Sequence, residues 1–228
     1  MYSGLILKYK FEAEFTSRLV AAIHAVLAVV LSFICILQGP DPLVTPGEEN
    51  TLMQIATMVV SLGYFIYDLW WCVVHQTEPV IILVHHAASI LAIFMILIYG
   101  SSGSEAVGGL ASLEFTNPLL QARWFLRMYG YGEAPLHTLV EVLFIVSFLF
   151  FRLGYGSKLL YSVLSHDNVV FPVKLFTVLL YVISIMFIYY IGQFIFRKYV
   201  LRSRSHCSDY MCEPDCECRR QQDKSSAE

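Results

Sequence analysis

Two adjacent histidines, His85 and His86, lie near the start of the long apolar segment VIILVHHAASILAIFMILIY (80–99). That segment is long enough to span a bilayer, where an ionisable side chain is a candidate functional group. A single buried histidine is more often a hydrogen-bonded structural residue, but here an acid, Asp68, lies in the preceding apolar segment. A carboxylate beside an imidazole fixes its tautomer and raises its basicity. His85, His86 and Asp68 are therefore the predicted catalytic residues if the chain is an enzyme, with histidine as general base or nucleophile.

Metal binding by the same groups is the alternative chemistry, with Glu141 as a further acidic ligand. Adjacent residues of a helix point about 100° apart, which makes chelation of one ion by both histidines awkward. We therefore expect no metal site and no bound cofactor.

The composition is that of a membrane protein with several spans. Of the 228 residues, 57% are hydrophobic and 14% are charged, which leaves no room for a second, soluble domain. Turn-rich segments separate six predicted transmembrane helices, at 19–38, 52–74, 80–99, 106–126, 136–155 and 171–196. We thus expect an all-α integral membrane protein, with a segment 1–14, a six-helix domain 15–200 and a polar tail 201–228. No cleavable signal peptide is expected, and the first helix would direct the chain to the membrane.

Basic residues indicate the orientation of these helices. They precede the first helix, end the fourth and follow the sixth, whereas the 39–50 loop is acidic. With an even number of spans, the positive-inside rule predicts that both termini are cytosolic.

The polar residues of the helices are predicted to lie at one depth. Counting from each loop at ~1.5 Å per residue places Asp68, His85 and His86 level with one another, roughly 9 Å from the cytosolic ends of their helices. Side chains of other helices fall at a similar depth, which predicts a pocket open to the cytosolic leaflet. Its lipid or substrate residues are His24, Tyr64, Asn117, Gln121 and Glu141.

Helical spacing supports this pocket. Tyr64 and Asp68 are four residues apart on one stripe of their helix, and Glu114, Asn117 and Gln121 are spaced i, i+3, i+7. The fourth helix is poor in branched apolar residues, so we expect it to face protein or water and to kink at Pro118. The alternative is that these polar groups snorkel to the interface, but the acidic and amide side chains are too short to reach far.

Several of these residues carry a resemblance to a known family. FTSRLVAAIHAVL (15–27), LGYFIYDL (62–69), HHAAS (85–89) and LEFTNPLLQARWFLR (113–127) together resemble motifs of the TLC domain family, over about residues 15–200. The resemblance implies a bundle of membrane helices. HHAAS is similar to the double-histidine start of the motif of ceramide synthases, which transfer an acyl group from acyl-CoA.

The chain departs from that motif after His86. The acidic continuation typical of ceramide synthases is missing from AASILAIFMILIYGSSGSEAVGG (87–109), which argues against ceramide synthesis. Many members of the family also have a further span before the core, which the charged residues 1–18 do not supply.

Two function classes remain open. The favoured one is a protein that binds or senses membrane lipid and affects lipid homeostasis. The alternative is a lipid acyltransferase that uses the His85/His86 pair with Asp68 and takes acyl-CoA as co-substrate. A role in handling membrane proteins rests on family analogy alone. The expected partners are membrane lipids and not nucleic acids, and the expected membrane is the endoplasmic reticulum, with the plasma membrane as alternative.

The tail has four cysteines, Cys207, Cys212, Cys216 and Cys218, whose spacing fits no common zinc module. On the cytosolic side they are expected to be reduced, and the tail is expected to be disordered.

Overall fold

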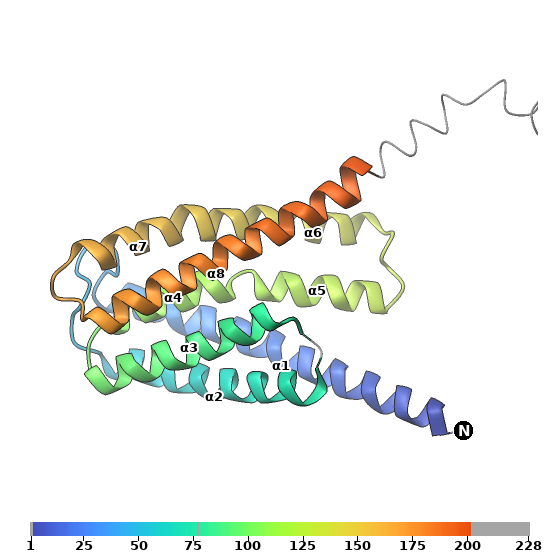
Figure 1. Ribbon diagram of the computed structural model, residues 1–228, viewed down its shortest axis with the longest axis horizontal. Helices are drawn as coiled ribbons and strands as arrows, with labels where there is room; N and C mark the ends of the chain where they lie inside the picture. Colours follow the sequence, from blue (N-terminus) through green and yellow to red (C-terminus); the bar gives the residue numbers. More distant parts are fainter. Residues whose placement is uncertain (1, 77, 202–228) are drawn as a thin grey trace, which may run out of the picture. The chain divides into compact units, whose positions relative to one another are not determined.

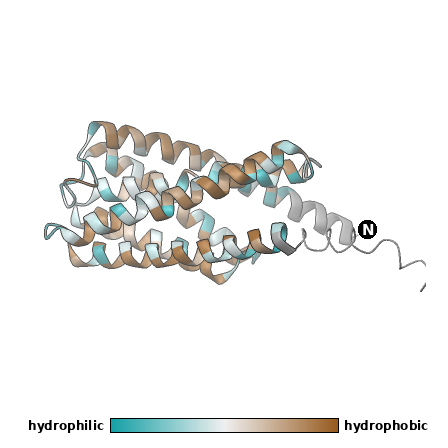
Figure 2. Cartoon of the chain, turned by 90° about the horizontal axis from the view of Figure 1, so that it is seen from above, coloured by the Kyte–Doolittle hydropathy of each residue, from teal (hydrophilic) through white to brown (hydrophobic). Residues whose placement is uncertain are grey.

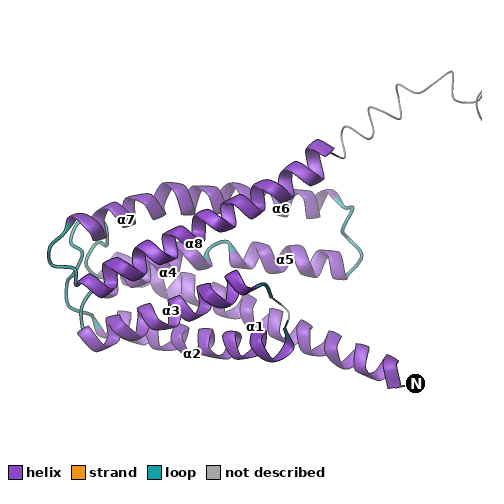
Figure 3. Ribbon diagram, viewed as in Figure 1, coloured by secondary structure: helices purple, strands orange, loops and turns teal. Residues whose placement is uncertain are grey.

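A computed structural model describes the backbone of residues 2–76 and 78–201 and the side chains of residues 12–76 and 78–199. The chain divides into two units, at Ile185 and Met186. The first unit holds seven α-helices, a π-helical segment and the start of α8. In the second unit the described residues continue α8 and end in the π-helical segment η2 (Phe196–Leu201). Figure 3 shows that the described chain is helical throughout, apart from short loops.

Five helices of the described residues are long and apolar enough to cross a membrane. They cover Glu12–Gln38, Leu52–His75, Val80–Tyr99, Pro135–Ser165 and Phe171–Tyr199. The first belongs to α1 (Tyr2–Gln38), which also runs through most of the predicted 1–14 segment, and the next two are α2 (Leu52–His75) and α3 (Val80–Tyr99). In Figure 2 much of the ribbon of these helices is brown, the colour of hydrophobic residues. Large apolar side chains such as Ile23, Ile98 and Val146 are more than half exposed, as expected where lipid replaces water around the bundle.

The predicted fourth span, 106–126, is not one continuous helix. The chain forms α4 (Gly103–Glu114) and α5 (Asn117–Met128), which follow each other along the bundle (Figure 1). Pro118 occupies the first turn of α5, where its missing N–H costs nothing, and its ring excludes an unbroken helix through the residues before it. The predicted kink is therefore a break at Phe115 and Thr116, and neither half alone is long enough to span a bilayer.

The predicted fifth span, 136–155, is longer than expected. α6 (Pro135–Leu149), the π-helical segment η1 (Phe150–Tyr155) and α7 (Gly156–Ser165) form one helix without a loop. Within η1 the wider turn changes the direction in which side chains leave the helix. Such π-helical turns are common at functional sites.

The helices of the first unit pack around α4. α1 lies against α4 and α5, and α2 lies between α1 and α3. The first part of α8 (Phe171–Ile195), up to Ile185, stands further from its neighbours and meets them through side chains: the Ser157 and Tyr181 hydroxyls are 2.8 Å apart. This spacing leaves room between α8 and the core.

The loops at one end of the bundle are fixed by polar contacts. Thr51 and Gln54 form a reciprocal capping box at the start of α2. The buried carboxylate of Glu105 accepts hydrogen bonds from the backbone N–H of Gly47 at 2.6 Å and from the Ser104 hydroxyl at 2.5 Å. Gly47 has φ +88°, a conformation that favours glycine. These contacts fix the 39–51 loop to the start of α4.

Candidate functional site

Asp68 and His86 form a buried acid–imidazole pair. The Oδ2 atom of Asp68 on α2 lies 3.1 Å from Nε2 of His86 on α3, and both side chains are at most 15% exposed. The other ring nitrogen of His86, Nδ1, is buried and has no hydrogen-bond partner. In this arrangement the carboxylate holds Nε2–H, and the lone pair of Nδ1 is left for a proton or an electrophile. The pairing of Asp68 with a histidine of the next helix is as the sequence predicts.

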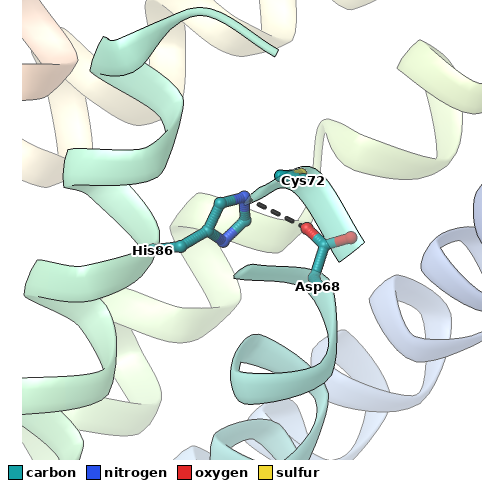
Figure 4. Close-up of side chains that lie close together, drawn as sticks. All are labelled: Asp68, Cys72 and His86. Atoms are coloured by element: carbon teal, nitrogen blue, oxygen red, sulfur yellow. Dashed lines mark ion pairs between the residues drawn. The ribbon is translucent and has the colours of Figure 1, made fainter. Parts of the chain in front are cut away.

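Cys72 extends this pair to a group of three possible metal ligands. Figure 4 shows Asp68 and Cys72 on one helix, with the His86 ring directed at Asp68. The Cys72 Sγ, a carboxylate oxygen of Asp68 and a ring nitrogen of His86 all lie within 4.8 Å of one another. The donor types suit zinc, and three protein ligands with an open position would resemble a catalytic zinc site. The direct Asp68–His86 contact, however, accounts for their closeness without an ion.

His85 is directed elsewhere than His86. The two ring centroids are 5.6 Å apart, and the charge of Arg152 acts on His85. The expected divergence of the adjacent histidines is therefore present, and only His86 belongs to the group around Asp68.

The remaining polar residues of the predicted pocket form a run of contacts across α1, α2, α4 and α5. The His24 ring stacks on Tyr64 with centroids 3.8 Å apart, and its Nδ1 lies 3.8 Å from Oε2 of Glu114. Asn117 donates to Glu114 at 3.1 Å, and Gln121 donates to Asn117 at 3.0 Å. The i, i+3, i+7 spacing thus indicates the contacting face correctly.

Glu141 forms an ion pair with Arg123, a residue outside the predicted pocket set. Its carboxylate, 1% exposed, lies 3.0 Å from Nη2 of Arg123, which joins α6 to α5. The sequence places Glu141 in the lipid pocket, whereas this contact gives it a structural partner that sequence reasoning did not identify.

Arg18 closes the polar run at the other end of the bundle from the 39–51 loop. Its guanidinium lies 3.0 Å from Glu14, 3.9 Å from Glu78 and 5.0 Å from the centre of the Trp124 ring. Burial raises the pKa of Glu78, a loop residue outside the spans, and the positive charge of Arg18 opposes that rise.

A cavity of about 120 Å³ lies inside the first unit, between α3, α4, η1, α7 and the start of α8. Its wall is mostly apolar, and it is not fully closed off from the outside of the bundle. An engineered apolar cavity of ~150 Å³ binds benzene, so this space can hold part of a hydrocarbon chain. None of the predicted pocket or catalytic residues is among those that line it; Ser89, which follows His86 by three positions, is.

Arg152 lies in the wall of this cavity, on η1. It is 6% exposed and donates to the Leu113 carbonyl at 3.3 Å and to the Ser184 hydroxyl at 3.4 Å. Arg152 is not among the functional residues predicted from the sequence. Its position within a long apolar segment, FIVSFLFFRLGYG (144–156), was the available signal, because a charge inside a span is costly unless it has a function.

Comparison with known proteins agrees with the motifs. A sequence profile of the TLC domain matches residues 14–207. The chain belongs to the TLC domain family. It is 25% identical over 147 residues to TLC domain-containing protein 4-B of Xenopus laevis, a match that covers 63% of this chain and 55% of that protein. The chain thus spans about half the length of this curated relative. No solved structure matches the chain.

Proposed function

We propose that this TLC domain protein binds a membrane lipid inside its helical bundle and affects membrane lipid homeostasis, in the endoplasmic reticulum. The observation that carries the proposal is the cavity between α3, α4, η1, α7 and the start of α8. The apolar ligand available to a membrane protein is a lipid chain. Such a chain would fill the poorly packed space between these helices and contact its apolar wall. Binding without turnover is favoured over catalysis because the cavity is lined by neither Asp68 nor His86.

The proposal is tested by lipid analysis of the purified protein and of two matched glycine variants. Gly109 lines the cavity, and a Cβ at that position would come no closer than 3.8 Å to Leu159. Gly109→Leu should therefore place its side chain in the cavity and lower the amount of co-purifying lipid, measured by mass spectrometry per mole of protein. Gly63→Leu, on an exposed position of α2 with nothing within 4 Å, is the control and should keep the lipid. Equal lipid in both variants would contradict binding in this cavity.

An acyltransferase activity is the second candidate, and the Asp68–His86 pair favours it. In this mechanism Asp68 orients His86 through Nε2, and Nδ1 accepts the proton of a hydroxyl or amine acceptor as it attacks the thioester of acyl-CoA. The thiolate of coenzyme A leaves with a proton, and the acceptor is acylated. His85 is the other histidine of the predicted catalytic set.

Turnover distinguishes the two candidates. Purified protein would be given labelled acyl-CoA and a panel of amine and hydroxyl lipids. The binding proposal expects no product. Loss of product in both His86→Ala and Asp68→Asn, with folding retained, would establish the acyltransferase. Product that persists in a His85→Ala/His86→Ala double variant would exclude catalysis by these histidines.

A further inference from the structure

We propose that Arg152 binds the carboxylate of a fatty acid whose hydrocarbon chain occupies the cavity. This inference rests on the proposed lipid-binding function and adds the chemical class of the ligand. It assigns the head of the ligand to η1 and its hydrocarbon chain to the mostly apolar part of the cavity wall.

Among the residues that the structure describes, no carboxylate forms an ion pair with the guanidinium of Arg152, although Glu114 interacts with it electrostatically at longer range. Its close contacts are with uncharged groups: the Leu113 carbonyl, the Ser184 hydroxyl and the Phe148 ring, whose centre is 4.8 Å away. Its Nε atom is buried and makes no hydrogen bond. A charged side chain near the middle of a membrane span normally pairs with an opposite charge, because desolvation of an isolated ion is expensive. A bound anion would supply a negative charge within hydrogen-bonding distance of the guanidinium.

Ser89 provides a second polar group in the lining of the cavity. Its side chain is 3% exposed, its Oγ atom has no hydrogen-bond partner, and it lines the same cavity as Arg152. A buried unpaired hydroxyl is uncommon, because it forgoes a hydrogen bond that water would have made. The guanidinium fork and this hydroxyl are the donors that a carboxylate accepts from.

The remainder of the wall is that of a chain-binding site. Leu110, Leu159, Val163, Val173 and Ile93 contribute apolar surface to the cavity. Because the cavity is not fully enclosed, a chain longer than its volume can continue into the surrounding lipid. The combination of one buried cation with an apolar cavity selects an amphiphile with a single anionic head.

Two acidic residues near the cavity favour a lipid whose head group carries one negative charge over a lipid whose head group carries two. Glu114 interacts electrostatically with Arg152, although its Oε2 atom accepts from Asn117 and lies near His24. Glu105 contributes to the cavity wall. A phosphate monoester carries about −1.5 to −2 charges and would meet stronger repulsion from these carboxylates than a fatty acid would.

The first test uses the wild-type protein alone. Purified protein in detergent is incubated with radiolabelled oleate, and unlabelled oleate, oleyl alcohol and oleoyl lysophosphatidate compete for the site. A charge-assisted pair at Arg152 predicts that oleate binds at least tenfold more tightly than oleyl alcohol, which has the same chain and no charge. Oleate should also bind more tightly than lysophosphatidate. The reverse order for these two anions would overturn the assignment of a carboxylate.

The second test uses variants of the arginine. Arg152→Gln should weaken oleate binding at least tenfold and leave the binding of labelled oleyl alcohol within about threefold of wild type. Arg152→Lys keeps a cation and should retain more oleate binding than Arg152→Gln. Arg127→Gln, at an exposed position on α5, is the matched control and should bind oleate as wild type does.

The outcomes separate this inference from the function on which it rests. If the wild-type protein binds neither oleate nor oleyl alcohol, both the lipid-binding function and the ligand assignment fail. If it binds both equally, lipid binding stands and the assignment to Arg152 is overturned. Because that comparison is made within the wild-type protein, it remains decisive even if Arg152→Gln does not fold.

Discussion

Replacing Glu141 by alanine should destabilise the protein strongly, because it would remove the buried carboxylate that pairs with Arg123. The Glu141 carboxylate is 1% exposed and lies 3.0 Å from Nη2 of Arg123. At that separation and an effective dielectric constant of ~20, two unit charges attract by about 5 kcal/mol. Removal of one member of a buried pair generally costs about 3–5 kcal/mol, because the other charge stays buried and unpaired. We expect a loss in this range for Glu141→Ala.

The same reasoning predicts partial recovery when both charges are removed. A double variant, Arg123→Met with Glu141→Leu, places apolar side chains of similar volume at both positions. Since desolvation of both ions is then avoided, its free energy of unfolding should be within about 1 kcal/mol of wild type and above that of Glu141→Ala. The two substitutions are therefore expected to be strongly non-additive.

The assay is equilibrium unfolding in mixed micelles with increasing SDS, followed by helical circular dichroism. Glu133→Ala, at an exposed loop position, is the control and should change the free energy of unfolding by no more than about 0.5 kcal/mol. A loss of less than about 1 kcal/mol of unfolding free energy in Glu141→Ala would refute the stabilising role of the Glu141–Arg123 pair. The same conclusion would follow if the losses of the single variants Arg123→Met and Glu141→Leu added up to the loss of the double variant. Lower lipid content in a fully stable Glu141→Ala protein would instead support its predicted place in the lipid pocket.

Three further predictions concern topology, metal and pH. A glycosylation acceptor inserted in the 39–51 loop should be modified and one at the C-terminus should not, because the basic residues favour cytosolic termini; the opposite pattern would reverse the orientation. The purified protein should contain far less than one zinc per chain by elemental analysis, and stoichiometric zinc that is lost in Cys72→Ser would refute this. Because burial raises the pKa of Glu78 above its unfolded value, its ionisation opposes folding, so the stability of wild type relative to Glu78→Gln should fall as pH rises from about 4 to about 7. A relative stability that rises over this range would mean that the attraction to Arg18 outweighs burial.

The class of the protein and most of its helices could be predicted from local properties of the amino-acid sequence. Length and apolarity over about 20 residues decide whether a helix can span a bilayer, and both are local properties. The α2 and α3 boundaries follow the predicted segments closely for this reason. The depth of polar residues was also predictable, because two helices joined by a short loop must bring residues equidistant from that loop to the same level. Asp68 and His86 meet in this way.

Which polar residues pair, and where space remains between helices, depends instead on how the helices pack together. Equal depth does not fix the rotation of a helix about its axis, so the contact between Glu141 and Arg123 could not be predicted from the sequence. Likewise, the π-helical turn that carries Arg152 and the spacing of α8 from α4 depend on packing among segments far apart in the chain. The cavity is a gap left by all of these helices together. Its existence follows from how their surfaces fit, which no single segment encodes.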